Sequence, residues 1–455
     1  MQKREEPKLA SVILAAGKGT RMKSDLAKVL HPVLGKPVIY RVLQALEGVN
    51  CSKNIVVVGH QAEQVQAFCQ EHFSNCSFAE QAVQKGSGHA AQMALPQLDD
   101  FEGYVLILNG DMTLLDRAIL EKVIHTTLEN DYALTLLTAN SAEHRDFGRI
   151  IRQADASIER ITEAKDCTPQ EYALTEVNVG AYCAKAEFLR RFLPQLTANN
   201  AQGELYLTDL VSLGSAAGEK IGAVVDDVVY ALGVNSRADL AKAAALLKER
   251  KLQELMLSGV TIIDPQSTWI EDQVQIGRDS EVWPGTVLQG TTSIGQGCKI
   301  GPNTQITDSK IGNNSAVLHS VLNKATVGNS VNIGPFAYLR PQANIADHAK
   351  IGDFVEIKNA NIGQGTKVPH LTYVGDADVG SGTNIGCGTI TCNYDGQAKH
   401  RTIIGDHVFI GSNSSLVAPV TVGSGAKTGA GTVVIRDVPE NSVVVGVPAH
   451  PISRR

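Results

Sequence analysis

Short apolar runs alternate with amphipathic stretches up to about Val234. The runs SVILAAG, NIVVVGH and YVLILNGD are typical of buried strands, and VIYRVLQALEG, QVQAFCQEHF and RAILEKVIHTTLEN are typical of helices that cover a sheet. This alternation predicts a three-layer α/β domain around a mainly parallel sheet. Such sheets bind ligands at the carboxyl ends of their strands, so we expect functional residues there.

The stretch 237–258 has a different composition. It is rich in Ala, Leu, Lys, Arg and Glu and contains neither Gly nor Pro, which predicts one long linker helix. We therefore expect an α/β domain at 1–236, the linker helix at 237–258 and a separate domain at 259–455.

A third pattern begins after Gly259, where an aliphatic residue followed by glycine recurs at fixed spacing. The steps are six residues from Ile294 to Ile300 and from Val327 to Ile333, and eighteen from Ile276 to Ile294. Three short faces of six residues then complete one coil, which predicts a triangular parallel β-helix with the aliphatic residues inside. We expect each adjacent glycine to tolerate turn geometry that a Cβ would hinder. An ordinary β-sandwich would instead show strands at spacings of about 8–12 residues.

Composition narrows the class of protein. A chain of 455 residues is long enough for two domains, and 41 basic against 47 acidic residues give no general reason to expect a nucleic-acid or membrane partner. The eight cysteines form no CxxC pair, which favours free thiols in a reducing compartment. The start lacks the apolar segment of a signal peptide, and no stretch is apolar enough to span a membrane. We expect a cytoplasmic protein.

A glycine-containing loop follows the first strand as LAAGKGTRM, residues 14–22. Backbone amides around Gly17 and Gly19 are suited to cradling phosphate, and Arg21 and Lys28 add positive charge beside them. The loop matches neither the Walker A pattern nor GxGxxG, so an adenylate P-loop and a dinucleotide site are disfavoured. Farther on, Asp111 ends the strand YVLIL; such an aspartate is usually a turn cap, but it is also suited to Mg²⁺ beside phosphates.

The LAAGKGTRM loop resembles the opening motif of the sugar nucleotidyltransferases, LAAGxGTRM followed by PKxL. Ala27 stands where that motif has proline, so we expect a less rigid approach to Lys28. Over nearly the whole chain the sequence resembles the family that joins N-acetylglucosamine-1-phosphate uridyltransferase to glucosamine-1-phosphate N-acetyltransferase. The resemblance implies a Rossmann-like nucleotidyltransferase domain that uses Mg²⁺ and UTP, with Arg21 and Lys28 catalytic and the metal at Asp111 and Asn235. The nucleotide- and sugar-binding residues it implies are Leu14, Ala15, Ala16, Gly17, Lys28, Gln81, Gly86, Ser87, Asn109, Gly110, Asp111, Gly148, Glu163, Asn178 and Asn235.

The second half resembles the hexapeptide-repeat acyltransferases, and this resemblance, not the spacing, implies that the β-helix is left-handed. Polar segments interrupt its repeat between Arg340 and Tyr394. In this family His370 would be the general base and Glu356 would orient it or tune it by its charge. The acceptor sugar phosphate would contact Arg340, Lys358, Tyr373 and Asn384, and acetyl-CoA would contact Cys387, Asn393, Tyr394, Ser412 and Ala430.

The resemblance also implies an oligomer and a pathway. Relatives are generally homotrimers with acetyl-CoA between their β-helices, and the product UDP-N-acetylglucosamine supplies peptidoglycan and lipopolysaccharide synthesis. One departure is that Val447 stands in a C-terminal segment where the family often has a basic residue beside the coenzyme; Arg454 or Arg455 are candidate substitutes. The alternative reading is a single-function sugar nucleotidyltransferase whose β-helix is a non-catalytic arm.

Overall fold

A computed structural model describes residues 7–142 and 146–451. The chain forms two compact units, residues 1–245 and 246–455, and the division falls within helix α8 (Arg237–Leu257). The predicted long helix is therefore present, whereas the boundaries 1–236, 237–258 and 259–455 stay a prediction. Within the described residues, no helix combines the length and apolarity that a membrane crossing needs.

The first unit is built on a nine-stranded sheet. Seven of its strands run in the order β11-β7-β10-β6-β1-β4-β5, and β8 and β9 extend from β10. Neighbours among these seven are parallel except at β10, which is antiparallel to both β6 and β7, and β8 is antiparallel to β9 and β10. The sheet strands are β1 (Leu9–Leu14), β4 (Lys53–Val58), β5 (Cys76–Glu80), β6 (Tyr104–Asn109), β7 (Leu134–Asn140), β8 (Arg149–Arg152), β9 (Ile158–Thr162), β10 (Glu176–Lys185) and β11 (Ile221–Asp226).

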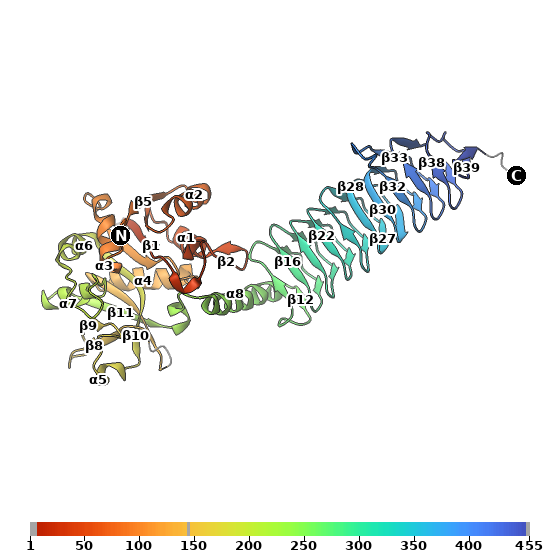
Figure 1. The fold of residues 1–455 in the computed structure, drawn as a ribbon. Coiled ribbons are helices and arrows are strands. Elements are labelled where there is room, and N and C mark those ends of the chain that lie inside the picture. The colour runs from red at the N-terminus through yellow and green to blue at the C-terminus, as the bar shows by residue number, and fades with distance from the viewer. Residues whose placement is uncertain (1–6, 143–145, 452–455) are drawn as a thin grey trace, which may run out of the picture. The chain divides into compact units, whose positions relative to one another are not determined.

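Helices cover both faces of this sheet (Figure 1). Alternate residues of β1 point to opposite faces, so Ile13 joins one buried apolar cluster and Val12 the other. The first cluster includes residues of α1, α2 and α4, and the second includes residues of α3, α6 and α7, which confirms the three layers. The helices are α1 (Val38–Glu47), α2 (Ala62–His72), α3 (Ser87–Ala94), α4 (Arg117–Glu129), α5 (Pro169–Tyr172), α6 (Ala186–Phe192) and α7 (Asp209–Ala216), with short 3₁₀ turns η1 (Thr20–Met22), η2 (Lys28–Leu30), η3 (Leu95–Gln97), η4 (Leu193–Gln195) and η5 (Val228–Ala231); β2 (Pro32–Val33) and β3 (Lys36–Pro37) form a separate hairpin.

The second unit is a parallel β-helix whose short strands stack coil upon coil (Figure 1). One of its sheets has twelve strands: β12 (Thr261–Ile262), β15 (Glu281–Val282), β18 (Lys299–Ile300), β21 (Ala316–Val317), β24 (Asn332–Ile333), β27 (Lys350–Asp353), β29 (Lys367–His370), β31 (Asn384–Ile385), β34 (Phe409–Ile410), β37 (Lys427–Thr428), β39 (Val443–Val445) and β40 (His450–Pro451). The other two faces form one continuous group of seventeen strands.

The strands of this larger group are β13 (Trp269–Ile270), β14 (Gln275–Ile276), β16 (Val287–Gln289), β17 (Ser293–Ile294), β19 (Gln305–Thr307), β20 (Lys310–Ile311), β22 (Val321–Asn323), β23 (Thr326–Val327), β25 (Tyr338–Leu339), β26 (Ala343–Ile345), β28 (Glu356–Ile362), β30 (Tyr373–Val379), β32 (Ile390–Cys392), β33 (Thr402–Ile404), β35 (Ser415–Val417), β36 (Val420–Val422) and β38 (Val433–Val434). The two sheets together complete each coil of the β-helix.

The register between coils confirms the predicted period. Ile276 pairs with Ile294, and Ile333 pairs with Ile351, so the repeated aliphatic residues form buried columns in one continuous core. The adjacent glycines have two roles: Gly301 and Gly334 have positive φ, as the predicted turn geometry requires, whereas Gly295 does not. A Cβ at Gly295 would lie 2.8 Å from the backbone nitrogen of Asn313 in the next coil. Coil stacking, rather than turn geometry, therefore excludes a side chain there.

One coil is longer than the others. Val379 pairs with Ile362 on one side and with Ile404 on the other, so the second step is longer by the insertion that contains Asn393 and Tyr394. Arg401 closes this insertion by donating hydrogen bonds to both carboxylate oxygens of Asp378. The loop is thus fixed to the wall of the β-helix.

Candidate functional sites

Two loops meet at the carboxyl edge of the sheet in the first unit. Parallel pairing places Leu14 of β1 beside Asn109 of β6, and the Gly110 amide donates to the Leu14 carbonyl at 2.9 Å. The loop that begins Leu14-Ala15-Ala16-Gly17 therefore lies directly against Asn109-Gly110-Asp111. This is the edge at which the sequence predicts ligand binding.

Gly17 and Gly19 of the first loop have different surroundings, so the absence of a side chain has a different consequence at each. Gly19 has φ +59°, and a Cβ there would lie 2.6 Å from the Cβ of Lys28, so the loop folds back closely onto the lysine. A Cβ at Gly17 would meet no atom within 4 Å, which leaves open space above the loop. Arg21 lies in η1 and is exposed. The loop thus combines a close approach to Lys28 with an open side suited to phosphate.

Lys28 links the two residues that the sequence assigns to the metal. Its Nζ donates to Asp111 Oδ2 at 2.6 Å and to Asn235 Oδ1 at 3.2 Å, and the side chains of Lys28 and Asp111 are only 15% and 13% exposed. The Val234 amide also donates to the Asp111 carbonyl at 3.1 Å, which ties the two segments together. A carboxylate and an amide oxygen therefore converge on one cation.

This donor set fits Mg²⁺. The ion usually takes one or two protein oxygens and completes its coordination with water and substrate phosphates. No group of three His, Cys, Asp or Glu side chains within 7–142 and 146–451 is arranged to hold a metal by itself. Asp111 and Asn235 can therefore supply the protein's share of a magnesium site that phosphates complete.

The segment 81–87 lies beside the first loop. Gln81 is buried, and its Nε2 donates to the Gly86 carbonyl at 3.0 Å. The Ser87 hydroxyl accepts the Leu207 amide at 3.1 Å. Gln84, which the sequence analysis did not single out, donates to the Ala16 carbonyl at 2.7 Å and so joins the segment to the loop after β1.

The three predicted sugar-pocket residues also meet. The backbone amide of Asn178 donates to the Gly148 carbonyl at 2.9 Å. A Cβ at Gly148 would lie 3.5 Å from Glu163 Oε2. Burial raises the pKa of Glu163, while the hydrogen bond from Thr208 opposes this shift and Asp166 and Asp209 add to it. The sequence analysis singled out neither aspartate: Asp166 is three residues from Glu163 in the same segment, whereas Asp209 comes from a distant one that the fold brings near.

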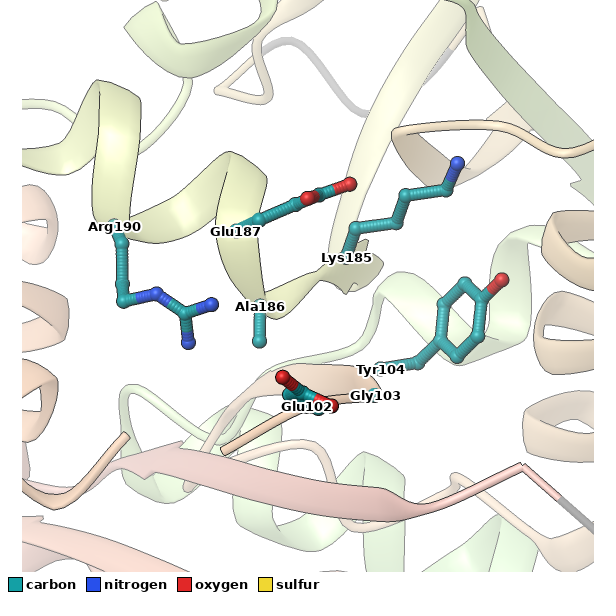
Figure 2. Close-up of a pocket in the computed structure, with 7 residues that line it drawn as sticks. All are labelled: Glu102, Gly103, Tyr104, Lys185, Ala186, Glu187 and Arg190. Carbon is teal, nitrogen blue, oxygen red and sulfur yellow. The ribbon is translucent and has the colours of Figure 1, made fainter. Parts of the chain in front are cut away.

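A pocket of about 380 Å³ lies away from these residues. It is lined by Glu102, Gly103, Tyr104, Lys185, Ala186, Glu187 and Arg190 (Figure 2). Tyr104 begins β6, whereas Asn109 ends it, and Lys185 ends the antiparallel strand β10. The pocket therefore lies at the opposite end of the sheet from the candidate nucleotide site.

In the second unit, the cationic residues stack in neighbouring coils. Register pairs Leu339 with Ile357, so Arg340 and Lys358 follow one another in one column. The Arg340 Nη1 donates to Glu356 Oε1 at 2.8 Å. Lys399, from the insertion, lies against Lys358 and lowers its pKa by contact, with burial as a smaller cause. Lys399 is a third cation that the sequence analysis did not single out.

His370 lies at the corner that joins β29 to β30, and Tyr373 follows it on β30. The Nδ1 atom of His370 contacts Oδ1 of Asp353 in the preceding coil. The structure thus brings Asp353 against His370, whereas Glu356 pairs with Arg340. Asp353 precedes His370 by 17 residues and not by the eighteen of the predicted repeat, so the observed register, in which the two are partners, is what identifies it.

The acetyl-CoA candidates occupy one corner of successive coils. The Asn413 amide donates to the Cys387 carbonyl at 2.7 Å, and the Gly431 amide to the Ser412 carbonyl at 2.8 Å, so Cys387, Ser412 and Ala430 form a column. The Leu371 amide donates to the Asp353 carbonyl in the same way. Val447 is 73% exposed, and Arg454 and Arg455 lie outside the described residues.

The other predicted acetyl-CoA and acceptor residues differ in burial and in the face of the β-helix on which they lie. Asn393 is buried, and its Nδ2 contacts Asp376 Oδ2 within the same chain, so its amide already has a partner. Tyr394 is exposed. Asn384 lies on β31 in the twelve-stranded sheet, whereas Tyr373 lies on β30 in the other. The predicted acceptor residues of one chain are therefore divided between two faces.

Comparisons with known proteins cover both units. Residues 11–258 match the family model of the MobA-like NTP transferase domain, and residues 401–436 match that of the bacterial transferase hexapeptide with six repeats. The chain is 47% identical to the bifunctional protein GlmU of Carboxydothermus hydrogenoformans over 438 residues, 96% of this chain and 97% of that protein. It is 47% identical to the same-named protein of Trichlorobacter lovleyi over 441 residues, 96% and 95% of the two chains.

Ala27 provides a test of the loop that carries Lys28. Its backbone has φ −51° and ψ 134°, which is a conformation that proline adopts without strain. We predict that Ala27→Pro raises the free energy of unfolding by about 0.4–1 kcal/mol by restricting the unfolded chain, with unchanged nucleotidyl transfer. Denaturant titration measures the effect. A lower free energy of unfolding, or a loss of nucleotidyl transfer, would show that the backbone at Ala27 does not accept the proline that the PKxL motif has at this position.

Proposed function

Since this chain belongs to the family of the bifunctional protein GlmU, it is a bifunctional enzyme of UDP-N-acetylglucosamine synthesis, and we propose how its residues divide the two reactions. The second unit acetylates glucosamine-1-phosphate, and the first unit then transfers uridylyl from UTP to the product. The observation that carries this proposal is that the predicted uridylyl-transfer residues lie in the first unit and the predicted acetyl-transfer residues in the second, in a chain that matches a transferase family model in each part. Similarity along both units argues against a non-catalytic β-helix arm.

In the acetyl transfer, the neutral amine of glucosamine-1-phosphate attacks the thioester carbonyl of acetyl-CoA. The C–N bond forms, the C–S bond breaks, and the amine proton passes to Nε2 of His370 and onward to the leaving coenzyme A thiolate. Arg340 and Lys358 bind the sugar phosphate, and Tyr373 and Asn384 position the acceptor. The corner column of Cys387, Ser412 and Ala430 lines the coenzyme groove with small side chains, and Tyr394, in the insertion after β32, is a further contact of the coenzyme.

In the uridylyl transfer, a phosphate oxygen of N-acetylglucosamine-1-phosphate attacks the α-phosphorus of UTP. A new P–O bond forms, the α–β phosphoanhydride breaks, and pyrophosphate leaves. No protein nucleophile is needed, because positioning and charge neutralisation supply the catalysis. Lys28 and Arg21 neutralise phosphate charge, the loop from Leu14 to Gly17 cradles the phosphates, and Gln81, Gly86 and Ser87 bind the uridine side.

Asp111 and Asn235 would hold Mg²⁺, which would supply positive charge at the phosphates. Lys28, which pairs with Asp111 in this structure, would bind the substrate phosphates. Gly148, Glu163 and Asn178 bind the acetamido sugar. The convergence of Asp111 and Asn235 on a single cation supports this assignment.

We also propose a cytoplasmic homotrimer. Phe336, Phe354 and Leu371 are more than half exposed along one corner of the β-helix, and the rings of Phe336 and Phe354 stack at 5.3 Å between centroids. Such an apolar row is suited to an interface between chains. All eight cysteines are free, which fits a reducing compartment. The product supplies precursor for peptidoglycan and lipopolysaccharide.

The first test removes the proposed metal ligand. We expect Asp111→Ala to lower uridylyl transfer by at least about 100-fold, because the metal and the phosphate charges lose their carboxylate partner, while acetyl transfer is nearly unchanged. Each half-reaction is measured separately with its own substrate. Asp131→Ala is a matched control, since Asp131 also forms an ion pair, with Lys185, but at the opposite end of the sheet. Full uridylyl activity in Asp111→Ala would refute the assignment.

The second test removes the proposed base. We expect His370→Ala to lower acetyl transfer by about 100- to 10,000-fold and to leave uridylyl transfer intact. The variant should form UDP-N-acetylglucosamine only when N-acetylglucosamine-1-phosphate is supplied. His348→Ala, which removes an exposed histidine from another corner of the β-helix, should retain both reactions. Acetyl transfer at the normal rate in His370→Ala would remove the histidine from the mechanism.

A further inference from the structure

One contact in the β-helix is not explained by the roles assigned above. Asp353 ends β27 and His370 ends β29 in the next coil, and the two are register partners. Their side chains meet through Asp353 Oδ1 and His370 Nδ1, while the Leu371 amide donates to the Asp353 carbonyl at 3.0 Å. Backbone register and side-chain contact therefore hold the same pair together.

A neutral imidazole carries a proton on one ring nitrogen and a lone pair on the other. The hydrogen-bond partner of one nitrogen determines which of the two carries the proton. An ionised carboxylate only accepts hydrogen bonds, so it favours the tautomer with the proton on Nδ1. The lone pair then lies on Nε2, the nitrogen that must receive the proton of the amine. The hydrogen bond from His370 lowers the pKa of Asp353, which keeps this carboxylate ionised.

We propose that Asp353 is the positioning residue of the acetyl-transfer site, and that it fixes the tautomer and orientation of His370. The inference rests on the proposed role of His370 as base. Asp353 touches neither substrate in this account and acts only through the imidazole, as a carboxylate does behind the histidine of other acyl-transfer sites. In this structure Glu356 pairs with Arg340 at 2.8 Å, whereas Nδ1 of His370 pairs with Asp353.

Kinetics separate this role from a purely structural one. We expect Asp353→Ala and Asp353→Asn to lower kcat for acetyl transfer at least about tenfold, with KM for glucosamine-1-phosphate and acetyl-CoA within about twofold, because substrate binding is intact but the base is misoriented. The asparagine variant matters most, since it preserves size but its amide can donate to Nδ1 and so select the wrong tautomer. Uridylyl transfer in the same samples reports correct folding of the first unit.

Asp347→Ala is the matched control. Asp347 also lies in a turn of the β-helix. Its Oδ1 accepts hydrogen bonds from the backbone amide of Asn329 at 2.7 Å and from the Asn329 side chain at 3.2 Å, so its partner is asparagine and not histidine. Its loss removes comparable coil-to-coil hydrogen bonds and should leave acetyl kcat unchanged. An equal loss of kcat in Asp347→Ala and Asp353→Ala would overturn the proposal, because both would then act through the stability of the coil.

A spectroscopic measurement tests the tautomer directly. In the full-length protein labelled with ¹⁵N-histidine, the His370 signals are assigned by their absence in His370→Ala. At a pH where the imidazole is neutral, we expect the proton on Nδ1 in the parent protein and predominantly on Nε2 in Asp353→Ala. The same tautomer in both proteins would contradict the inference. Normal acetyl transfer in His370→Ala would instead refute the base itself, so the two failures are distinguishable.

Discussion

The backbone hydrogen bonds between successive coils determine which side chains can meet in the second unit. They pair Asp353 with His370 and place Arg340 beside Lys358, although each pair is separated by a full coil of sequence. Close stacking at Gly295 shows how little freedom the coils have to slide. A slip of one residue along a strand would turn each of these side chains to the other face, so the chemistry depends on the register.

Register has the same role in the first unit. Pairing of β1 with β6 sets the loop after Leu14 against Asp111, and the hydrogen bond from Val234 adds Asn235 to the same point. Lys28 then neutralises a carboxylate that is largely shielded from water. An unpaired carboxylate there would be costly, which explains why Lys28 lies against Asp111; the proposed Mg²⁺ would bind the same oxygens.

The sequence was sufficient where a pattern repeats or where a motif is local. The spacing of Ile276, Ile294 and their successors predicted the β-helix, and the motif after Leu14 was correctly expected to lie at the carboxyl end of its strand. It was insufficient where partners come from distant segments: Lys399 lies against Lys358 from an insertion that Arg401 fixes to Asp378. Ala27 shows a further limit, since its folded backbone already resembles proline and any loss of rigidity belongs to the unfolded chain.

The central claim is that the two units carry complete and separable reactions. Its most direct test is to mix purified Asp111→Ala and His370→Ala proteins with glucosamine-1-phosphate, acetyl-CoA, UTP and Mg²⁺. Neither protein alone should make UDP-N-acetylglucosamine, but the mixture should, because the first releases N-acetylglucosamine-1-phosphate and the second consumes it. If each variant retains its own half-reaction and the mixture still forms no product, the two units do not act as separable sites.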